Sequence, residues 1–449
     1  MPMTTSNTTQ LPPAILTFFG ITGDLSKRKL LPALYYLAED NMLPEAFKIV
    51  GVTRHGTTVD KVITDIQSSL KERKENFQQE TLDKLRRIIV IVTMDILDPV
   101  EYARLKTRLD SIEDESKVCM NRLFYLAMPS EMFRPVTQLL DKNGLNTGCQ
   151  HGKTESRLLI EKPLGYDLSS ATSLIDNICQ AFNEKQLYLI DHYLAKPAVQ
   201  KLMAFKLDPN GPKPAWNKDN IKRIIIRADE SIGIEGRAIF YEQMGALRDF
   251  LQSHLLQLLA IITMDKPANN SAEAIQTAKI EALNSVLPPQ IDRIDITTVR
   301  GQYSGYRDEV NNPNSSIETF AAVKLEINSE QWSGVEIVLR TGKKLKAKAT
   351  NIQLVFKVPG SNDEPNLIIH IEPGSEDSSR NSIKYRDDYE HVLVGAATGD
   401  KTLFATKEEI LASWRIIEPI LKSWAQNVPE ISHYEQESDG PAAFNQLII

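Results

Sequence analysis

The strongest constraint on the fold of this chain is the alternation of short apolar runs with longer amphipathic stretches over its first 190 residues. The apolar runs are typical of buried strands and cover residues 14–20, 48–54, 87–92, 122–128, 156–163 and 187–191. The stretches between them have helical spacing, as in KRKLLPALYYLAED. Because strands that alternate with helices form parallel βαβ units, the pattern predicts an α/β domain with a doubly wound sheet.

The pattern changes after residue 200, where strands follow one another in succession. Strand-like segments cover residues 221–230, 320–328, 334–340, 351–358 and 366–373, and one long helical stretch, roughly 241–264, interrupts them. Successive strands of this kind predict an α+β domain with a large, mainly antiparallel sheet. The 449 residues are too many for one ordinary core, so we predict two domains, 12–190 and 191–449.

Composition and charge exclude several classes of protein. The chain is 42% hydrophobic and 25% charged, as in globular proteins. Its net charge of -7 argues against a general binder of nucleic acids or membrane surfaces, so an anionic ligand must be met by local clusters of basic residues. The polar start MPMTTSNTTQLPPA lacks the pattern of a signal peptide, and no apolar run reaches the roughly 18 residues of a membrane span.

The three cysteines, Cys119, Cys149 and Cys179, are scattered and have no CxxC spacing. Such a sparse, odd set is typical of a reducing compartment and predicts neither a disulfide framework nor a metal site. With the absence of targeting and membrane segments, it predicts a soluble, cytoplasmic protein.

The first predicted strand ends in a glycine-containing turn, Gly20 to Leu25, before a helix opens. Glycines in a strand-to-helix turn let the backbone approach a pyrophosphate, and the helix N-terminus supplies N–H donors. Gly20, Thr22, Gly23, Asp24 and Leu25 are therefore candidate cofactor-binding residues in a Rossmann-type domain. A spacing of GxxG is common in ordinary turns, however, and Asp24 could equally be a helix cap.

Two further strand ends fit a dinucleotide site. The second strand ends in Arg54, where an arginine suits a ribose 2′-phosphate, so NADP is favoured with NAD possible as a second cofactor. The alternative is that Arg54 is only a solvated charge at a strand end. Glu161-Lys162-Pro163 follows another strand, and its proline is a candidate cis residue that would aim Lys162 into the cleft. A plain surface turn is the alternative here.

The stretch LIDHYLAK places four polar groups just past an apolar segment: Asp191, His192, Tyr193 and Lys196. A core strand has no use for a carboxylate, an imidazole, a phenol and an ammonium within six residues. A site that binds a charged, hydroxylated small molecule, in contrast, needs polar groups of these kinds.

Taken together, these motifs resemble the glucose-6-phosphate dehydrogenase family. The stretches that carry the resemblance are GITGDLSKRKLLPALY, RLFYLAMPSEMF, RLLIEKPLGYDL, IDHYLAK, ESIGIEGRAIFYEQMGALRDFLQSHLLQLL and LRTGKKL, with weaker similarity through residues 399–424. The resemblance implies oxidation of glucose 6-phosphate at C1 to a lactone, the first step of the oxidative pentose phosphate pathway, with hydride passed to NADP or NAD. It also implies a dinucleotide-binding domain and a homodimer formed through the antiparallel sheet. No metal site is predicted.

The resemblance implies that His254 is the general base and that Asp191 orients its imidazole. The chemistry suits this pairing, because a histidine titrates near neutral pH and a carboxylate fixes its tautomer. Without the resemblance, a lone histidine in an apolar helix is more often a core residue. Asp249 and His254 also lie effectively about 140° apart on an ideal helix, so either the sugar lies along the helix or the helix is irregular.

The remaining roles implied by the resemblance concern the substrate. His192, Tyr193 and Lys196 would bind the phosphate, and Lys162 a sugar hydroxyl near the nicotinamide. The other substrate-binding candidates are Glu230, Asp249, Lys343, Lys348 and Glu372.

The chain departs from the usual family pattern at a few positions. Ala195 and Pro197 flank Lys196 where glycine and glutamate are usual, Ser253 stands where asparagine is common, and Glu372 stands where glutamine is common. An alanine at a position with positive φ costs on the order of 1 kcal/mol, whereas proline is welcome in a first helical turn. The alternatives to a glucose-6-phosphate dehydrogenase are another NAD(P)-dependent sugar dehydrogenase and a degenerate homologue without catalysis.

Overall fold

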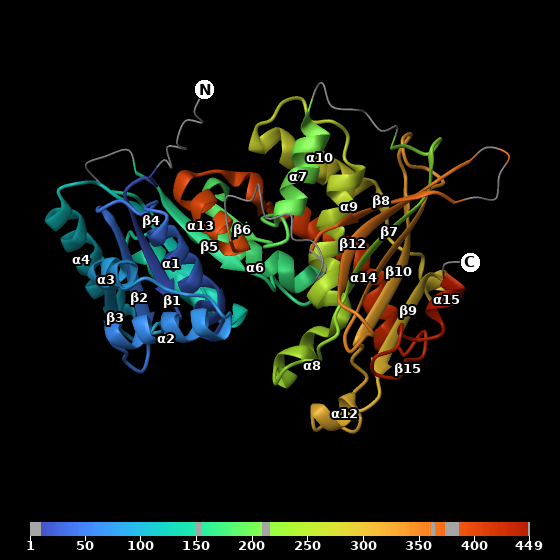
Figure 1. Cartoon of the computed structure of the whole chain (residues 1–449), viewed down its shortest axis with the longest axis horizontal. Coiled ribbons are helices and arrows are strands. Elements are labelled where there is room, and N and C mark those ends of the chain that lie inside the picture. Colours follow the sequence, from blue (N-terminus) through green and yellow to red (C-terminus); the bar gives the residue numbers. More distant parts are fainter. Residues whose placement is uncertain are drawn as a thin grey trace. The chain divides into compact units, whose positions relative to one another are not determined.

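A computed structural model describes residues 10–149, 154–208, 216–358, 360, 364–372 and 386–447 of the chain (Figure 1). The chain forms two compact units. The first comprises Met1–Leu164, Ser173–Ala195 and Ile383–Ala405, and the second Gly165–Thr172, Lys196–Ser382 and Thr406–Ile449. The boundary between residues 190 and 191 stays a prediction, and each unit is described by itself below.

The first unit contains a seven-stranded sheet in the order β14-β6-β5-β4-β1-β2-β3. All neighbours are parallel except β14, which pairs antiparallel with β6. The strands are β1 (Ala14–Phe19), β2 (Phe47–Thr53), β3 (Ile89–Thr93), β4 (Asn121–Leu126), β5 (Ser156–Glu161), β6 (Leu187–Ile190) and β14 (Phe404–Ala405). The order 3-2-1-4-5-6 is that of a Rossmann fold, which confirms the predicted fold class of this region.

Helices cover both faces of this sheet. Side chains of α1, α2, α3 and α13 share one core with alternate residues of β1, including Leu16 and Phe18, whereas Phe19 stacks on Tyr102 of α4 on the opposite face. The helices are α1 (Leu31–Glu39), α2 (Val59–Glu72), α3 (Gln79–Ile88), α4 (Pro99–Ser116), α5 (Phe133–Lys142), α6 (Leu168–Ala181) and α13 (Asp388–Thr398), with short turns η1 (Ser26–Leu30), η2 (Ser130–Met132), η3 (Glu184–Gln186) and η6 (Lys401–Leu403). The start of α6, up to Thr172, belongs to the second unit. Burial on both faces explains why the central strands are continuously apolar.

The second unit contains the predicted large, mainly antiparallel sheet, in the order β13-β12-β7-β11-β10-β9-β15, with β8 paired to β10. Only the pairs β7–β11 and β9–β15 are parallel among the strands of this sheet that the structure describes. The strands are β7 (Ile221–Asp229), β8 (Val286–Leu287), β9 (Thr298–Tyr303), β10 (Phe320–Ile327), β11 (Glu336–Gly342), β12 (Ala349–Phe356), β13 (Asn366–His370) and β15 (Ser432–Tyr434). Residue 373, the expected end of the last predicted strand, lies outside the described residues.

The long helical stretch is confirmed as helical but is not one regular helix. It consists of α8 (Ala238–Ala246), a π-helix η4 (Leu247–Leu255) and α9 (Leu256–Thr263). Gly245 breaks the helical conformation with φ 62° and ψ 177°. The other helices of this unit are α7 (Pro197–Leu207), α10 (Ala272–Ser285), α11 (Ile294–Thr297), α12 (Tyr306–Glu309), α14 (Lys407–Ala425) and α15 (Phe444–Leu447), with a short turn η5 (Ile291–Arg293).

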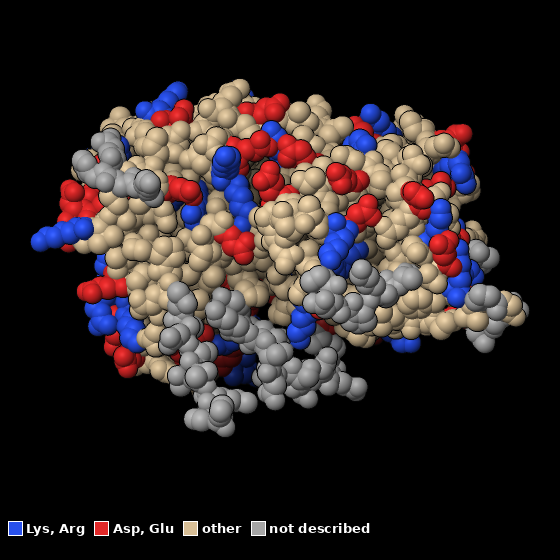
Figure 2. Space-filling model, turned by 90° about the horizontal axis from the view of Figure 1, so that it is seen from above, with Lys and Arg blue, Asp and Glu red and all other residues tan. Residues whose placement is uncertain are grey.

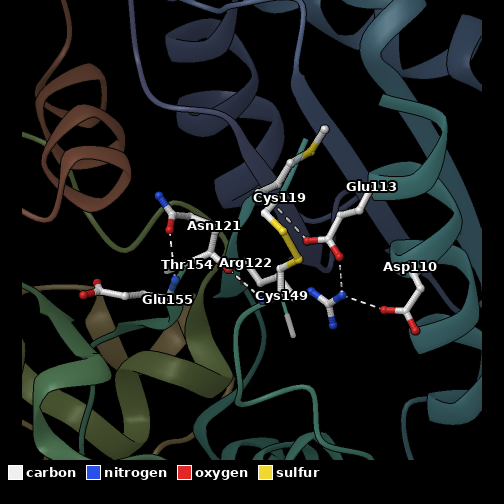
Figure 3. Close-up of a disulfide and its surroundings, with 9 residues drawn as sticks. Asp110, Glu113, Cys119, Asn121, Arg122, Cys149, Thr154 and Glu155 are labelled. Carbon is white, nitrogen blue, oxygen red and sulfur yellow. Dashed lines mark hydrogen bonds and ion pairs between the residues drawn. A yellow bond between two sulfur atoms is a disulfide. The ribbon is translucent and has the colours of Figure 1, made fainter. Parts of the chain in front are cut away.

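The structure corrects the prediction for the cysteines, because Cys119 and Cys149 form a disulfide (Figure 3). Cys119 lies just before the start of β4, and Cys149 lies in the connection between α5 and β5. Since β4 and β5 are parallel neighbours, their starts lie side by side, and two cysteines 30 residues apart in sequence come together there. Spacing in the sequence could not show this, because the pairing depends on the order of strands in the sheet.

Acidic and basic side chains are interspersed over the face shown in Figure 2. Within the described part of the chain, no helix is long and apolar enough to cross a membrane, and no group of His, Cys, Asp and Glu residues could hold a metal ion.

Candidate functional site

The predicted phosphate-binding turn directly follows β1 in the first unit. Gly20 has φ +99°, and a Cβ atom at this position would lie 2.4 Å from the carbonyl oxygen of Ala127, which follows β4. The turn is closed by hydrogen bonds to the Gly20 carbonyl from the N–H of Gly23 and the hydroxyl of Ser26, both 2.9 Å long. β1 and β4 are the strands at which the sheet order reverses, where open α/β sheets bind their ligands. The bare backbone at Gly20 therefore fits a dinucleotide pyrophosphate.

The rest of the predicted turn is accessible. Thr22 and Asp24 are exposed, and Leu25 is half-buried. The carboxylate of Asp24 forms an ion pair with Arg28, 2.8 Å long, one helical turn later. The N-cap position of η1 is Leu25 and not Asp24, and no side chain caps it, so the structure does not support a plain capping role for Asp24.

Substituting Gly20 with alanine is expected to impair both folding and cofactor binding. The Cβ atom adds a clash with the backbone to the cost of a positive φ, which is roughly 1–2 kcal/mol by itself. Gly144→Ala is the matched control, because Gly144 has φ +65° and a Cβ atom added there would meet nothing within 4 Å. Thermal unfolding would measure the loss of stability, and cofactor titration the loss of affinity. Equal losses of stability and affinity in the Gly20 and Gly144 variants would contradict a role for the close approach of Gly20 to the Ala127 carbonyl.

Two other cofactor candidates stand at the same edge of the sheet. Arg54 directly follows β2 and is exposed, and Lys162 directly follows β5. The peptide bond between Lys162 and Pro163 is cis, as predicted. Because β1, β2 and β5 run parallel in one sheet, the turn after β1 and these two residues all lie at its carboxyl edge.

The stretch after β6 forms a turn rather than continuing the strand. Asp191 is buried and accepts a hydrogen bond, 3.1 Å long, from the backbone N–H of Tyr193. The ring of His192 lies edge-on to the Tyr193 ring and stacks on the Tyr389 ring, at centroid distances of 5.1 and 6.1 Å. Asp191, His192 and Tyr193 are thus held by contacts within the first unit, whereas Lys196 belongs to the second unit.

Sequence reasoning missed Glu161, a half-buried glutamate whose charge interacts with that of Asp191, as a functional candidate. Glu161 ends β5 and accepts hydrogen bonds from the hydroxyls of Tyr125 and Tyr389. Burial raises the pKa of Glu161 to about 7; the two hydroxyls and the ammonium of Lys162 oppose this shift, and the charge of Asp191 adds to it. The signal was its place in the Glu-Lys-Pro motif, but only the fold shows the two tyrosines.

In the second unit, four of the predicted substrate residues gather at one end of the sheet. Lys343 directly follows β11, Glu230 directly follows β7, Lys348 directly precedes β12, and Glu372 lies two residues past β13. The register aligns these strand ends, since the last residue of β7 lies opposite both the last residue of β11 and the first residue of β12. Strands far apart in sequence therefore present their polar side chains together.

Lys343 forms the most buried ion pair of this group. Its side chain is only 2% exposed, and its ammonium lies 2.5 Å from the Glu230 carboxylate. The ammonium also lies over the rings of Tyr241 and Phe250, and the Phe250 ring lies edge-on to the His254 ring at 5.3 Å. The Phe250 ring therefore lies next to both the Lys343 ammonium, which pairs with Glu230, and the His254 ring.

The π-helix resolves the geometric difficulty of Asp249 and His254. Leu256 directly follows the π-helix, and its backbone N–H donates a hydrogen bond to the carbonyl of Leu251, five residues earlier. In such a helix, residues five apart lie about one turn apart, so Asp249 and His254 are brought toward one face. The side chain of His254 is buried, and the charge of Asp249 acts on Tyr241, whose pKa is raised by burial first and then by this carboxylate.

The departures around Lys196 cause no strain in the backbone. Ala195 is buried and is not among the described residues with positive φ. Lys196 has φ -62° and ψ 135°, the extended conformation expected before proline, and Pro197 is the first residue of α7.

Glu372 lies between two lysines. Its carboxylate oxygens lie 2.9 Å from the ammonium of Lys196 and 2.6 Å from that of Lys348. Burial raises the pKa of Glu372, but the two ammonium groups more than offset this effect and leave the pKa below its usual value. The group is therefore a carboxylate at neutral pH.

The similarity to known proteins extends over nearly the whole chain. The family model described as Glucose-6-phosphate dehydrogenase, NAD binding domain, matches residues 17–201, and that of the C-terminal domain matches residues 203–376 and 368–449. The chain belongs to the glucose-6-phosphate dehydrogenase family. The family predicted from the sequence is thus confirmed.

Individual members of this family are also similar to the chain over nearly its whole length. The chain is 34% identical to the glucose-6-phosphate 1-dehydrogenase of Bacillus subtilis, with 98% of each chain covered, and 32% identical to that of Rhizobium meliloti, with 96% and 95% covered. Its structure is similar to that of a glucose-6-phosphate dehydrogenase in complex with its substrate glucose 6-phosphate, with a TM-score of 0.87, 28% identity and 98% of both chains covered. The enzyme from Mycobacterium avium gives a TM-score of 0.84 at 30% identity, with 98% and 97% covered.

Proposed function

We propose that this protein oxidises glucose 6-phosphate at C1 to 6-phosphogluconolactone and passes the hydride to a nicotinamide cofactor. The observation that carries the proposal is similarity to glucose-6-phosphate dehydrogenases across both units, including a relative solved with that substrate. The cluster of Lys343, Glu230 and His254 supports it, because a polyhydroxylated sugar needs buried donors and acceptors of this kind.

In the proposed reaction, the imidazole of His254 removes the proton from the C1 hydroxyl while the hydride leaves C1. The bound cofactor supplies the hydride acceptor. Glu230, Asp249 and Lys343 hold sugar hydroxyls, Lys162 a further hydroxyl near the nicotinamide, and His192, Tyr193 and Lys196 the phosphate. That Asp191 orients the imidazole stays a prediction from the resemblance.

A substrate panel tests the proposal. Initial rates of cofactor reduction would be measured by absorbance with glucose 6-phosphate, free glucose and other sugars. We expect glucose 6-phosphate to be the preferred substrate. Turnover of free glucose at least equal to that of glucose 6-phosphate would instead favour another sugar dehydrogenase, and no turnover at all would favour a non-catalytic homologue.

We further propose NADP as the preferred cofactor, supported by the exposed Arg54 at the end of β2. Arg54→Ser is expected to lower kcat/KM for NADP by about 10- to 100-fold, because a charge-assisted hydrogen bond is worth about 1.5–3 kcal/mol, and to change kcat/KM for NAD little. Arg87→Ser, which removes an exposed arginine of α3, is the control. An equal loss with both cofactors would show that Arg54 does not read the 2′-phosphate.

The homodimer and the cytoplasmic location stay predictions. The dimer has support in β13, where the apolar side chains of Leu367 and Ile368 are 42% and 43% exposed and would be covered by a second copy.

A further inference from the structure

The carboxylate of Glu372 pairs with the ammonium groups of two lysines that are candidates for binding the substrate. Lys196 is the proposed phosphate ligand, and Lys348 is a further substrate-binding candidate. Each lies within 3 Å of a different oxygen of Glu372. An anion is therefore already bound at this end of the sheet, and it belongs to the chain itself.

The two ion pairs differ in burial. The side chains of Lys196 and Glu372 are 10% and 21% exposed, whereas that of Lys348 is 64% exposed. Exposed ion pairs contribute little, so the pair with Lys196 dominates. The carboxylate lowers the net charge of the three groups from +2 to +1, which weakens their attraction for a phosphate dianion.

We propose that Glu372 is an internal competitor of the substrate phosphate and sets the affinity for phosphorylated sugars. This inference rests on the proposed function. When glucose 6-phosphate binds, its phosphate displaces the carboxylate from Lys196, and Glu372 turns to Lys348 or to solvent. The residue determines affinity and takes no part in the chemical step.

The experiment is a comparison of three variants with the wild type. In Glu372→Gln the negative charge is removed at constant shape, and KM for glucose 6-phosphate is expected to fall by about 5- to 10-fold, by more than kcat changes. Glu372→Asp keeps the charge and is expected to stay near the wild-type KM. Glu364→Gln is the matched control, because Glu364 precedes β13 at its other end and pairs with Lys222.

Two measurements separate the charge at the phosphate from other effects. Inorganic phosphate should inhibit Glu372→Gln more strongly, with Ki lower by a similar factor, whereas KM for free glucose should not fall. An unchanged KM of Glu372→Gln for glucose 6-phosphate would overturn the proposal. A raised KM would also overturn it, and would show that Glu372 positions Lys196 or binds the sugar directly.

Calorimetric titration with inorganic phosphate tests the competition even if the protein does not oxidise glucose 6-phosphate. The proposed competition and the proposed function can therefore fail separately.

Discussion

Replacing His254 with asparagine is expected to lower kcat with glucose 6-phosphate by about 10²- to 10⁴-fold, the usual contribution of a general base. Asparagine keeps a polar group in the buried site but does not accept the C1 proton at neutral pH. The ring of His254 is only 1% exposed and contacts Phe250, so the imidazole is held by packing. The rate of cofactor reduction measures the loss.

Binding of glucose 6-phosphate to His254→Asn has to be measured in addition to the rate of cofactor reduction. We expect glucose 6-phosphate to raise the midpoint of thermal unfolding of His254→Asn nearly as much as that of the wild type. His433→Asn serves as the control, because His433 is an exposed histidine on β15 of the same unit. Normal turnover by His254→Asn would remove this residue from the mechanism.

Replacing Lys279 with methionine is expected to destabilise the second unit by about 3–5 kcal/mol, the cost of leaving a buried charge without its partner. The side chains of Lys279, on α10, and Glu409, on α14, are both 0% exposed, and their ion pair is 2.8 Å long. Gln257 of α9 donates to the same carboxylate and accepts from the same ammonium. The network thus ties three helices together.

Tryptophan fluorescence can follow this unfolding in urea, because the four tryptophans, Trp216, Trp332, Trp414 and Trp424, all lie in the second unit. The double variant Lys279→Met/Glu409→Leu is expected to regain at least half of the lost stability, since it leaves no charge of this pair buried. A double variant as unstable as the single one would show that packing, and not the unpaired carboxylate, causes the loss.

Much of the first unit could be predicted because its strands are apolar and regularly spaced. Its six parallel strands, most of them buried on both faces, were found within a few residues of their observed ends. The strands that escaped prediction are short or polar: β8 and β14 have two residues each, β15 has three, and β9 reads TVRGQY. Such segments become strands only because a neighbouring strand offers hydrogen-bonding groups, which local composition does not record.

Local backbone conformation could also be read from residue types. Gly20 adopts the positive φ that its turn requires, Lys162–Pro163 is cis, and Pro197 opens a helix. In each case the covalent structure of one residue limits the allowed conformations, so no knowledge of the rest of the fold is needed.

Relations between distant segments had to come from the tertiary structure. The disulfide between Cys119 and Cys149, the hydroxyls around Glu161 and the π-helix that turns Asp249 toward the face of His254 follow from strand order and packing. By itself the sequence determined the two fold classes, the family and the candidate side chains, because periodicity and motifs are local. The tertiary structure decided which of those side chains meet within each unit, such as Glu372 with its two lysines, because such contacts depend on strand register and not on distance along the chain.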